Sequence, residues 1–312
     1  YKVAAGFPLN QKQMLPWLKN IETLIIVEEK RGFLEAEVIS LLQSNGLTPK
    51  IFGKKFDGAE GFPAHGGLNY DIIQAKLLPL LEKTAKHIPT CTLEQSLPKR
   101  LPTFCPGCPH RETLSVLKEI RAELDKEGLK LLTHGDVGCY SLSFLAPFKE
   151  MHNLSAMGQG GALGAGVDLF VTNPSVVLMG DSTFFHSGLT DISNSVQLDH
   201  DITYILLDND NTAMTGHQMT PASGLSVEGK TRPRQSMLQV AKALGVKEAL
   251  EIHPSDRYFY KNLLLSFVKR SGVKVIVSTK ECALTFHGKQ GAHDREVFKN
   301  EGRLYIKSLD VQ

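Results

Sequence analysis

Short apolar runs alternate with segments of helical character along most of this chain. Residues 175–179 (SVVLM) and 202–207 (ITYILL) are rich in β-branched and apolar residues, as is typical of strands buried on both faces of a parallel sheet. Because strands that alternate with helices build βαβ units, the pattern predicts an α/β fold with a doubly wound parallel sheet. Further strands are predicted at 24–27, 50–54, 129–133 and 273–279, and helices at 33–44, 75–86, 111–126, 158–170, 187–198 and 236–244.

A proline-rich stretch divides the chain into two parts. Residues 87–103 contain three prolines and a Lys-Arg pair, and proline both removes a backbone donor and disfavours helix before it. The stretch therefore predicts a linker. A smaller α/β domain is expected at 1–86, a larger one at 104–290 and a C-terminal extension at 291–312.

Composition is that of an ordinary globular protein and narrows the class of partner. The 312 residues are 42% hydrophobic and 22% charged, and 35 Lys and Arg against 33 Asp and Glu leave a net charge of +2. That balance gives no electrostatic footprint for nucleic acid or a membrane surface, and no apolar run reaches the length of a membrane span. The five cysteines, an odd number without a secretory signal, indicate a reducing, cytoplasmic location. Because it begins with Tyr1, the chain is interpreted as part of a longer protein.

Oxygen-bearing side chains follow two of the predicted strands where each strand ends. GDS at 180–182 directly follows the strand at 175–179, and DNDN at 208–211 follows the strand at 202–207. Doubly wound sheets bind ligands outside the carboxyl ends of their strands, and carboxylate, amide and carbonyl oxygens suit a Mg²⁺ that also binds a diphosphate. A helix starting after each loop would direct its N-terminus at that diphosphate. Each segment alone is also an ordinary turn former, but two of them one βα unit apart favour a metal site.

Four cysteines occur at or beside predicted strand ends. CPGCPH at 105–110 puts two thiols on one Pro/Gly turn, while Cys139 and Cys282 follow the strands at 129–133 and 273–279. The four thiols could converge near the expected diphosphate as ligands of one metal or cluster. A single CxxC pair is also compatible with a redox dithiol or half of a zinc site, and Cys282 with a buried apolar residue. A Cys₄ zinc site usually contains two CxxC pairs, and only one is present in this sequence.

Together these motifs resemble one family. GDS at 180–182, followed by DNDNTAMTGHQ at 208–218, is similar to the GDG…NN signature of thiamine diphosphate enzymes. With CPGCPH and with GDVGCYSL at 135–142, the chain resembles the 2-oxoacid:ferredoxin oxidoreductases, in particular their indolepyruvate branch. The positions that depart from the usual family residues are Pro109, Ser182 and Asp208.

The resemblance implies a role for each motif residue. The implied Mg²⁺ ligands are the side chains of Asp181 and Asn209 and the carbonyl oxygen of Asn211. The implied ligands of a [4Fe–4S] cluster are Cys105, Cys108, Cys139 and Cys282. Further implied contacts to thiamine diphosphate are Gly138, Gly158, Gln159, Gly160, Gly180, Ser182, Thr215 and Gly216. The implied catalytic residues are Met214, beside the thiazolium, and His217, toward the substrate. No role is implied for Cys91, and His110 is either a contact of the site or a structural residue.

The activity that the resemblance implies is oxidative decarboxylation of a 2-oxoacid, with an arylpyruvate such as indolepyruvate as substrate. The acyl group would pass to coenzyme A, and the electrons would pass through the cluster to ferredoxin. The family also implies a pyrimidine-binding domain before Tyr1, a ferredoxin-like segment after Gln312, a smaller partner subunit and an oligomer, so the chain alone would lack a complete active site. Residues 1–86 would be a transketolase C-terminal-like domain. Two alternatives stay open: a non-oxidative thiamine diphosphate decarboxylase or synthase, and a zinc-stapled α/β interaction module.

Overall fold

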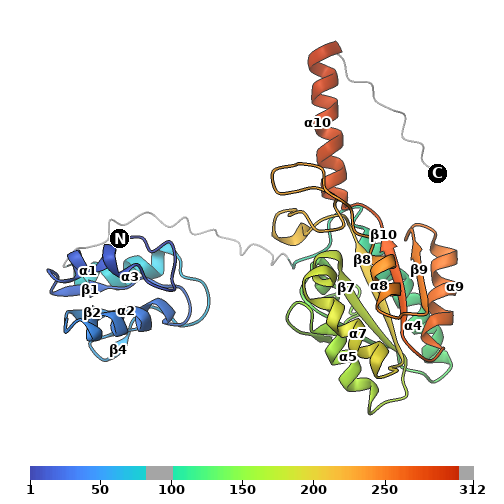
Figure 1. Ribbon diagram of the computed structural model, residues 1–312, viewed down its shortest axis with the longest axis horizontal. Helices are drawn as coiled ribbons and strands as arrows, with labels where there is room; N and C mark the ends of the chain where they lie inside the picture. The colour runs from blue at the N-terminus through green and yellow to red at the C-terminus, as the bar shows by residue number, and fades with distance from the viewer. Residues whose placement is uncertain (82–100, 302–312) are drawn as a thin grey trace, which may run out of the picture. The chain divides into compact units, whose positions relative to one another are not determined.

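The computed structural model describes residues 1–81 and 101–301 and separates the chain into two compact units, Tyr1–Leu97 and Pro98–Gln312. The division falls within the stretch 87–103. Most of that stretch, including Cys91, lies outside the described residues, as does the end of the expected C-terminal extension. Each unit has its own buried core and is described by itself (Figure 1).

The N-terminal unit combines a short parallel strand pair with helices. β1 (Thr23–Ile25) pairs in parallel with β2 (Lys50–Phe52), and α2 (Phe33–Ser44) connects the two strands. The remaining elements of this unit are α1 (Gln11–Leu18), β3 (Lys55–Phe56), β4 (Ala59–Glu60) and α3 (Tyr70–Leu80). Aliphatic side chains form its core, including Met14, Leu18, Ile26, Val38, Leu41 and Leu42.

The C-terminal unit is built on a six-stranded parallel sheet with the strand order β6-β5-β7-β8-β10-β9. β7 (Ser175–Gly180) and β8 (Ile202–Asp208) lie in the middle of the sheet, and nearly all of their residues are buried, as the apolar runs predicted. Helices cover both faces, so the predicted doubly wound parallel sheet is confirmed. The other strands are β5 (Leu132–Gly135), β6 (Asn153–Leu154), β9 (Glu248–Ile252) and β10 (Lys274–Thr279).

Alternate residues of the central strands face two separate cores. Val176 and Leu178 pack into the core on one face, whereas Val177 and Met179 pack into the core on the other. Because successive side chains of a strand point to opposite faces, a strand covered on both sides must be apolar throughout. The first core receives α4 (Pro109–Lys126) and α9 (Arg257–Val268), and the second α5 (Gly160–Asp168), α7 (Leu189–Gln197) and α8 (Met237–Ala243). Figure 1 shows α4 and α9 on the opposite side of the sheet from α5 and α7.

The helices that follow the two oxygen-rich loops differ from each other. After β7 the helix begins at Asp181 with α6 (Asp181–Thr183) and continues through a π-helical turn (Phe184–Gly188) into α7, so it starts before the expected residue 187. After β8, the described residues 209–236 contain a 3₁₀ turn (Ala213–Thr215) and loops but no α-helix. The expectation of a helix start is therefore right for the first loop and wrong for the second.

The last helix extends away from the sheet. α10 (Ala283–Glu301) begins after β10 and continues past residue 290, where the sequence alone predicted the end of the domain (Figure 1). Among the described residues, no helix is both long and apolar enough to cross a lipid bilayer.

Candidate functional site

A cavity lies outside the carboxyl ends of β5, β7 and β8. Its wall is formed by three segments that each follow one of these strands: Val137–Tyr140 after β5, Asp181–Thr183 after β7, and residues from Asn209 to Thr215 after β8. His110 of α4 and Met157 complete the wall. The structure thus brings both oxygen-rich loops to one cavity, which we call the diphosphate cavity.

Asp181 is the most deeply buried carboxylate on this wall. It is 3% exposed at the first position of α6, where it accepts the Ser182 backbone N–H at 2.6 Å. Burial, and secondarily the charge of Asp208, raise the pKa of Asp181 to about 7. A buried carboxylate with no cation among its neighbours is costly, so this environment favours either a proton or a metal ion.

The Asn209 amide faces two oxygen atoms. One of its terminal atoms lies 2.6 Å from the Asn211 carbonyl oxygen and 3.3 Å from Asp181 Oδ2. If that atom is the nitrogen, it donates to both oxygens; if it is the oxygen, it lies beside the other two oxygens. The second arrangement is the donor set of a hard cation, and it consists of the three predicted Mg²⁺ ligands. The residues present therefore fit Mg²⁺.

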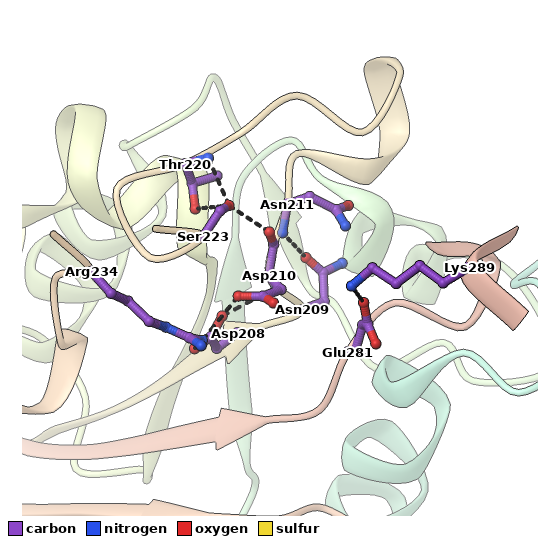
Figure 2. Close-up of polar contacts among 9 residues, drawn as sticks. All are labelled: Asp208, Asn209, Asp210, Asn211, Thr220, Ser223, Arg234, Glu281 and Lys289. Carbon is purple, nitrogen blue, oxygen red and sulfur yellow. Dashed lines mark hydrogen bonds and ion pairs between the residues drawn. The ribbon is translucent and has the colours of Figure 1, made fainter. Parts of the chain in front are cut away.

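Two residues that the sequence reasoning missed hold the 208–211 loop in place. Asp210 has a left-handed backbone (φ 72°), and its carbonyl oxygen accepts the Ser223 hydroxyl at 2.6 Å. Arg234 lies 2.9 Å from Asp210 Oδ1 and 3.9 Å from Asp208 Oδ2 (Figure 2). Burial raises the pKa of Asp208 to about 6, and Arg234 counters that rise. The loop is therefore fixed by partners from the following segment 220–236, outside the recognisable motif.

The four cysteines line a second cavity, which we call the thiol cavity. Its wall includes Cys105, Cys108, Cys139 and Cys282. It shares residues with the diphosphate cavity, namely His110, Cys139, Asn209, Ala213 and Met214. Burial and the neighbouring thiols raise the pKa of Cys139 to about 11. Within residues 1–81 and 101–301, no group of three or more His, Cys, Asp or Glu side chains is arranged to hold a single metal ion.

Backbone hydrogen bonds connect the cysteine segments to the rest of the site. Cys108 precedes the first residue of the long helix α4, and the backbone N–H groups of His110 and Arg111 point at its sulfur. The Cys282 N–H donates to the carbonyl oxygen of Asn209 at 3.1 Å. The turn that carries Cys282 is thus bonded directly to the 208–211 loop. A group held by these thiols would lie beside the diphosphate cavity.

The other predicted residues fall into two groups. Met214 is 44% exposed and lines both cavities, while the diphosphate cavity also receives Gly138, Gly180, Ser182 and Thr215. Four predicted contacts line neither cavity in the part of the chain that the structure describes: Gly158, Gln159, Gly160 and Gly216. The first three lie at the start of α5 beside the end of β5, where the Gly158 N–H donates to the Asp136 carboxylate at 2.8 Å.

His217 is turned toward α10. Its Nδ1 lies 3.1 Å from Thr285 Oγ1 and 3.3 Å from the side-chain oxygen of Asn211, and it lines neither of the two cavities. Gly216, immediately before it, has φ 127°, a backbone conformation that glycine adopts readily. The catalytic role predicted for His217 therefore stays a prediction.

Tyr140 and Asp136 form a buried pair that the sequence motifs did not predict. The Tyr140 hydroxyl donates to the Asp136 carboxylate, and burial raises the pKa of Asp136 to about 6. The tyrosine ring fits where Gly180 has no side chain, since a Cβ there would lie 3.1 Å from the ring. The signal in the sequence is the pair of glycines, Gly138 and Gly180, whose missing side chains leave room for an aromatic ring.

Two family descriptions match the chain. Residues 136–277 match the thiamine pyrophosphate enzyme, C-terminal TPP-binding domain. Residues 1–97 match the indolepyruvate oxidoreductase domain. The first match contains both oxygen-rich loops, and the second covers the N-terminal unit.

Curated relatives carry the same indication. An indolepyruvate oxidoreductase subunit IorA from Methanothermobacter marburgensis is 29% identical over 286 residues, and the subunit of that name from Thermococcus kodakarensis is 27% identical over 307 residues. Each match covers 91% of this chain and 45% of the relative, so the chain spans about half the length of these relatives.

One solved structure supports the fold. A 2-oxoglutarate:ferredoxin oxidoreductase from Magnetococcus marinus, determined with 2-oxoglutarate, coenzyme A and succinyl-CoA bound, superimposes with a TM-score of 0.52 and 22% sequence identity. The superposition covers 59% of this chain and 66% of that chain.

Proposed function

We propose that the chain is the diphosphate-binding part of a 2-oxoacid:ferredoxin oxidoreductase, because residues 136–277 match the C-terminal TPP-binding domain of thiamine enzymes and residues 1–97 match the indolepyruvate oxidoreductase domain. The observation that carries the proposal is the continuity of the two cavities. The thiol cavity, which the four cysteines line, shares Asn209, Met214 and other residues with the diphosphate cavity. A diphosphate site without such thiols would suit a decarboxylase or synthase instead.

The diphosphate cavity would bind thiamine diphosphate through Mg²⁺. Asp181 and Asn209 would supply side-chain oxygens and Asn211 its carbonyl oxygen; in support, the Asn209 side chain contacts both of the other groups. The start of α6 would present backbone N–H groups to the diphosphate. When bound, thiamine diphosphate supplies a carbanion and an electron sink for loss of CO₂ from a 2-oxoacid. Met214, half-exposed on both walls, would lie against the reacting end of the cofactor.

The thiol cavity would hold a [4Fe–4S] cluster through its four cysteines. Thiolates are the usual ligands of such clusters, and a cluster accepts electrons one at a time. The helix α4 would stabilise the negative charge at Cys108, because its first backbone N–H groups point at that sulfur. Reduced thiols of this kind suit a cytoplasmic location.

The complete reaction is proposed from the names of the relatives. Their shared description as an indolepyruvate oxidoreductase subunit favours an arylpyruvate substrate, and the structural neighbour favours coenzyme A as acyl acceptor and ferredoxin as electron acceptor. Because the chain spans about half of the relatives' length, the proposal includes further domains and a smaller partner subunit that complete the active site in an oligomer.

The test is metal and cofactor analysis of the full-length complex, purified under strict anaerobiosis. We expect about four iron atoms and four acid-labile sulfides per chain from this cluster, in addition to those of any ferredoxin-like segment, together with Mg²⁺-dependent binding of thiamine diphosphate. An iron-free, colourless protein that still binds thiamine diphosphate would replace the oxidoreductase with a non-oxidative enzyme. Zinc in place of iron, with no thiamine diphosphate binding, would favour the interaction module.

A further inference from the structure

We propose that His110 is a positioning residue that turns the Asn209 amide so that its oxygen faces Asp181 and the Asn211 carbonyl. The inference rests on the proposed function, since it concerns the Mg²⁺ site formed by these residues. It connects two parts of the chain that no motif joins: the turn after Cys108 and the 208–211 loop, 99 residues apart at the contact.

His110 is buried at the point where the two cavities meet. It lies in the first turn of α4, is 4% exposed, and lines both the diphosphate cavity and the thiol cavity. Its Nε2 lies 3.4 Å from Asn209 Nδ2. The ring of Tyr140 packs edge-on against it, with centroids 6.2 Å apart, and restricts its rotation. A fixed, buried ring therefore stands on one side of the Asn209 amide.

The two ends of that amide are in contact with different partners. One end faces His110 Nε2, and the other faces the Asn211 carbonyl oxygen at 2.6 Å and Asp181 Oδ2 at 3.3 Å. An amide has one oxygen and one NH₂ group, so whichever faces His110, the other faces the two oxygens. The group that faces His110 therefore decides whether the amide presents its oxygen or its nitrogen to Asp181 and the Asn211 carbonyl.

The two nearby oxygens alone favour the orientation in which the amide nitrogen, not its oxygen, occupies the metal-facing side. With its nitrogen toward Asp181 and the Asn211 carbonyl, it donates two hydrogen bonds. With its oxygen there, it accepts the Asn211 backbone N–H at 3.4 Å and otherwise faces two acceptor oxygens until a cation arrives. A neutral imidazole whose Nε2 carries the lone pair accepts the Asn209 NH₂ group and so favours the oxygen-inward arrangement. This is the action of an outer partner that orients a metal ligand.

The two arrangements assign different hydrogen bonds to His110. When its Nε2 accepts, the amide oxygen is available to the cation; when its Nε2 carries the hydrogen, the ring donates to the amide oxygen and the nitrogen closes the metal position. His110 also stands two residues after Cys108 on the same turn, and its backbone N–H points at the Cys108 sulfur. One residue thus contacts both the thiol wall and the metal-binding loop.

The experiment measures Mn²⁺ binding by electron paramagnetic resonance in the full-length complex with thiamine diphosphate present. H110F removes the acceptor while keeping a ring, and we expect about tenfold weaker Mn²⁺ binding, the size of effect typical of an outer partner of a metal ligand. H110Q keeps an acceptor oxygen, so its Mn²⁺ affinity should stay within about threefold of that of the natural protein. If H110F does not fold, H110M serves as the acceptor-free variant.

The deciding comparison uses N209D, whose carboxylate presents an oxygen to the metal in either orientation. In the N209D background, H110F should have no further effect on Mn²⁺ affinity, because there is no longer an amide to turn. An equal loss of affinity in both backgrounds would mean that His110 only supports the fold, and would overturn the inference. D181N separates the two proposals: if D181N abolishes Mn²⁺ binding while H110F and H110M leave it unchanged, the metal site stands and the role of His110 fails. If the natural protein binds no Mn²⁺ with thiamine diphosphate, the proposed function itself fails.

Discussion

Asp181 is a single residue held in an electrostatically unfavourable environment. Its carboxylate is buried, faces the Asn209 amide and has Asp208 nearby, and burial is the main cause that raises its pKa to about 7. Ionised and without a cation, such a group destabilises the native state relative to the unfolded chain, where it is solvated. A bound Mg²⁺ would reverse that effect, so the cost belongs to the metal-free protein.

We predict that D181N stabilises the metal-free chain. The pKa of Asp181 is higher in the folded state than in the unfolded state, so its ionisation destabilises the fold at pH values above the unfolded pKa, and the effect grows until the pH passes about 7. At pH 8 the free energy of unfolding should increase on the order of 3 kcal/mol, measured by urea denaturation with chelator present. The gain should shrink steadily as the pH falls from 7 toward 4.

The matched control is D199N, which changes a carboxylate exposed to solvent. It should leave the free energy of unfolding nearly unchanged at both pH values, because surface substitutions are usually neutral within about 0.5 kcal/mol. D181N should also lose Mg²⁺-dependent binding of thiamine diphosphate. A variant that is less stable than the natural chain at pH 8 would contradict the interpretation of Asp181 as a buried, unpaired charge.

At the scale of an element, α5 is the helix whose small residues bring it against the sheet. A Cβ on Gly160 would lie 2.9 Å from the carbonyl carbon of Gly135 at the end of β5, and backbone atoms cannot move aside as a side chain can. Gly166, on the exposed side of the same helix, has no heavy atom within 4 Å of the corresponding point. Close packing against β5 therefore requires glycine at position 160 but not at position 166.

We predict opposite effects of alanine at these two positions. G160A should lower the free energy of unfolding by about 2 kcal/mol or more, because the helix must shift away from β5. G166A should raise it by about 0.5–1 kcal/mol, since alanine is favoured over glycine inside a helix. Thermal and urea unfolding of the two variants provide the measurement, and equal effects at both positions would show that α5 does not pack as closely as the geometry indicates.

The elements that could be predicted are those whose signal lies in consecutive residues. The apolar runs of β7, β8 and β10 and the periodic apolar positions of α2 and α4 gave the central strands and helices close to their observed bounds. β9 was missed because it is a short edge strand whose sequence, EALEI, includes two glutamates and has no clear alternation. The early start of the helix at Asp181 was missed because STFFH at 182–186, which forms the turns before α7, has no helical apolar pattern.

The candidate site likewise contains residues that could be predicted from the sequence and residues that could not. The motif residues Asp181, Asn209 and the four cysteines could be selected from spacing at strand ends, and the parallel sheet then places those ends on one edge. The contacts of His110 with Asn209 and of Arg234 with Asp210 could not, since each joins loops whose paths depend on packing elsewhere. Motif spacing identifies candidate ligand-binding residues more readily than it identifies the residues that contact them from other loops.

For the whole molecule, the arrangement of the thiol cavity predicts which cysteines hold iron. Cys105, Cys108, Cys139 and Cys282 line one cavity although three separate parts of the chain contribute them, whereas Cys91 falls outside the described residues and outside the motifs. Serine at any of the four removes a soft sulfur ligand that a cluster needs. We expect each of C105S, C108S, C139S and C282S to lose about four iron atoms and four acid-labile sulfides per chain from the anaerobic full-length complex, because the cluster needs all four ligands.

C91S is the matched control and should keep its full iron content. Cys282 makes the most discriminating variant, because it is buried and stands in the segment with the least distinctive motif, yet its backbone N–H is bonded to Asn209. If C282S retains iron while the other three variants lose it, the cluster has another fourth ligand, and the coupling between the two cavities must be reassigned. If C282S loses iron but still binds thiamine diphosphate and Mg²⁺, the two sites are separable in binding although they share a wall, and the shared residues serve electron transfer rather than assembly.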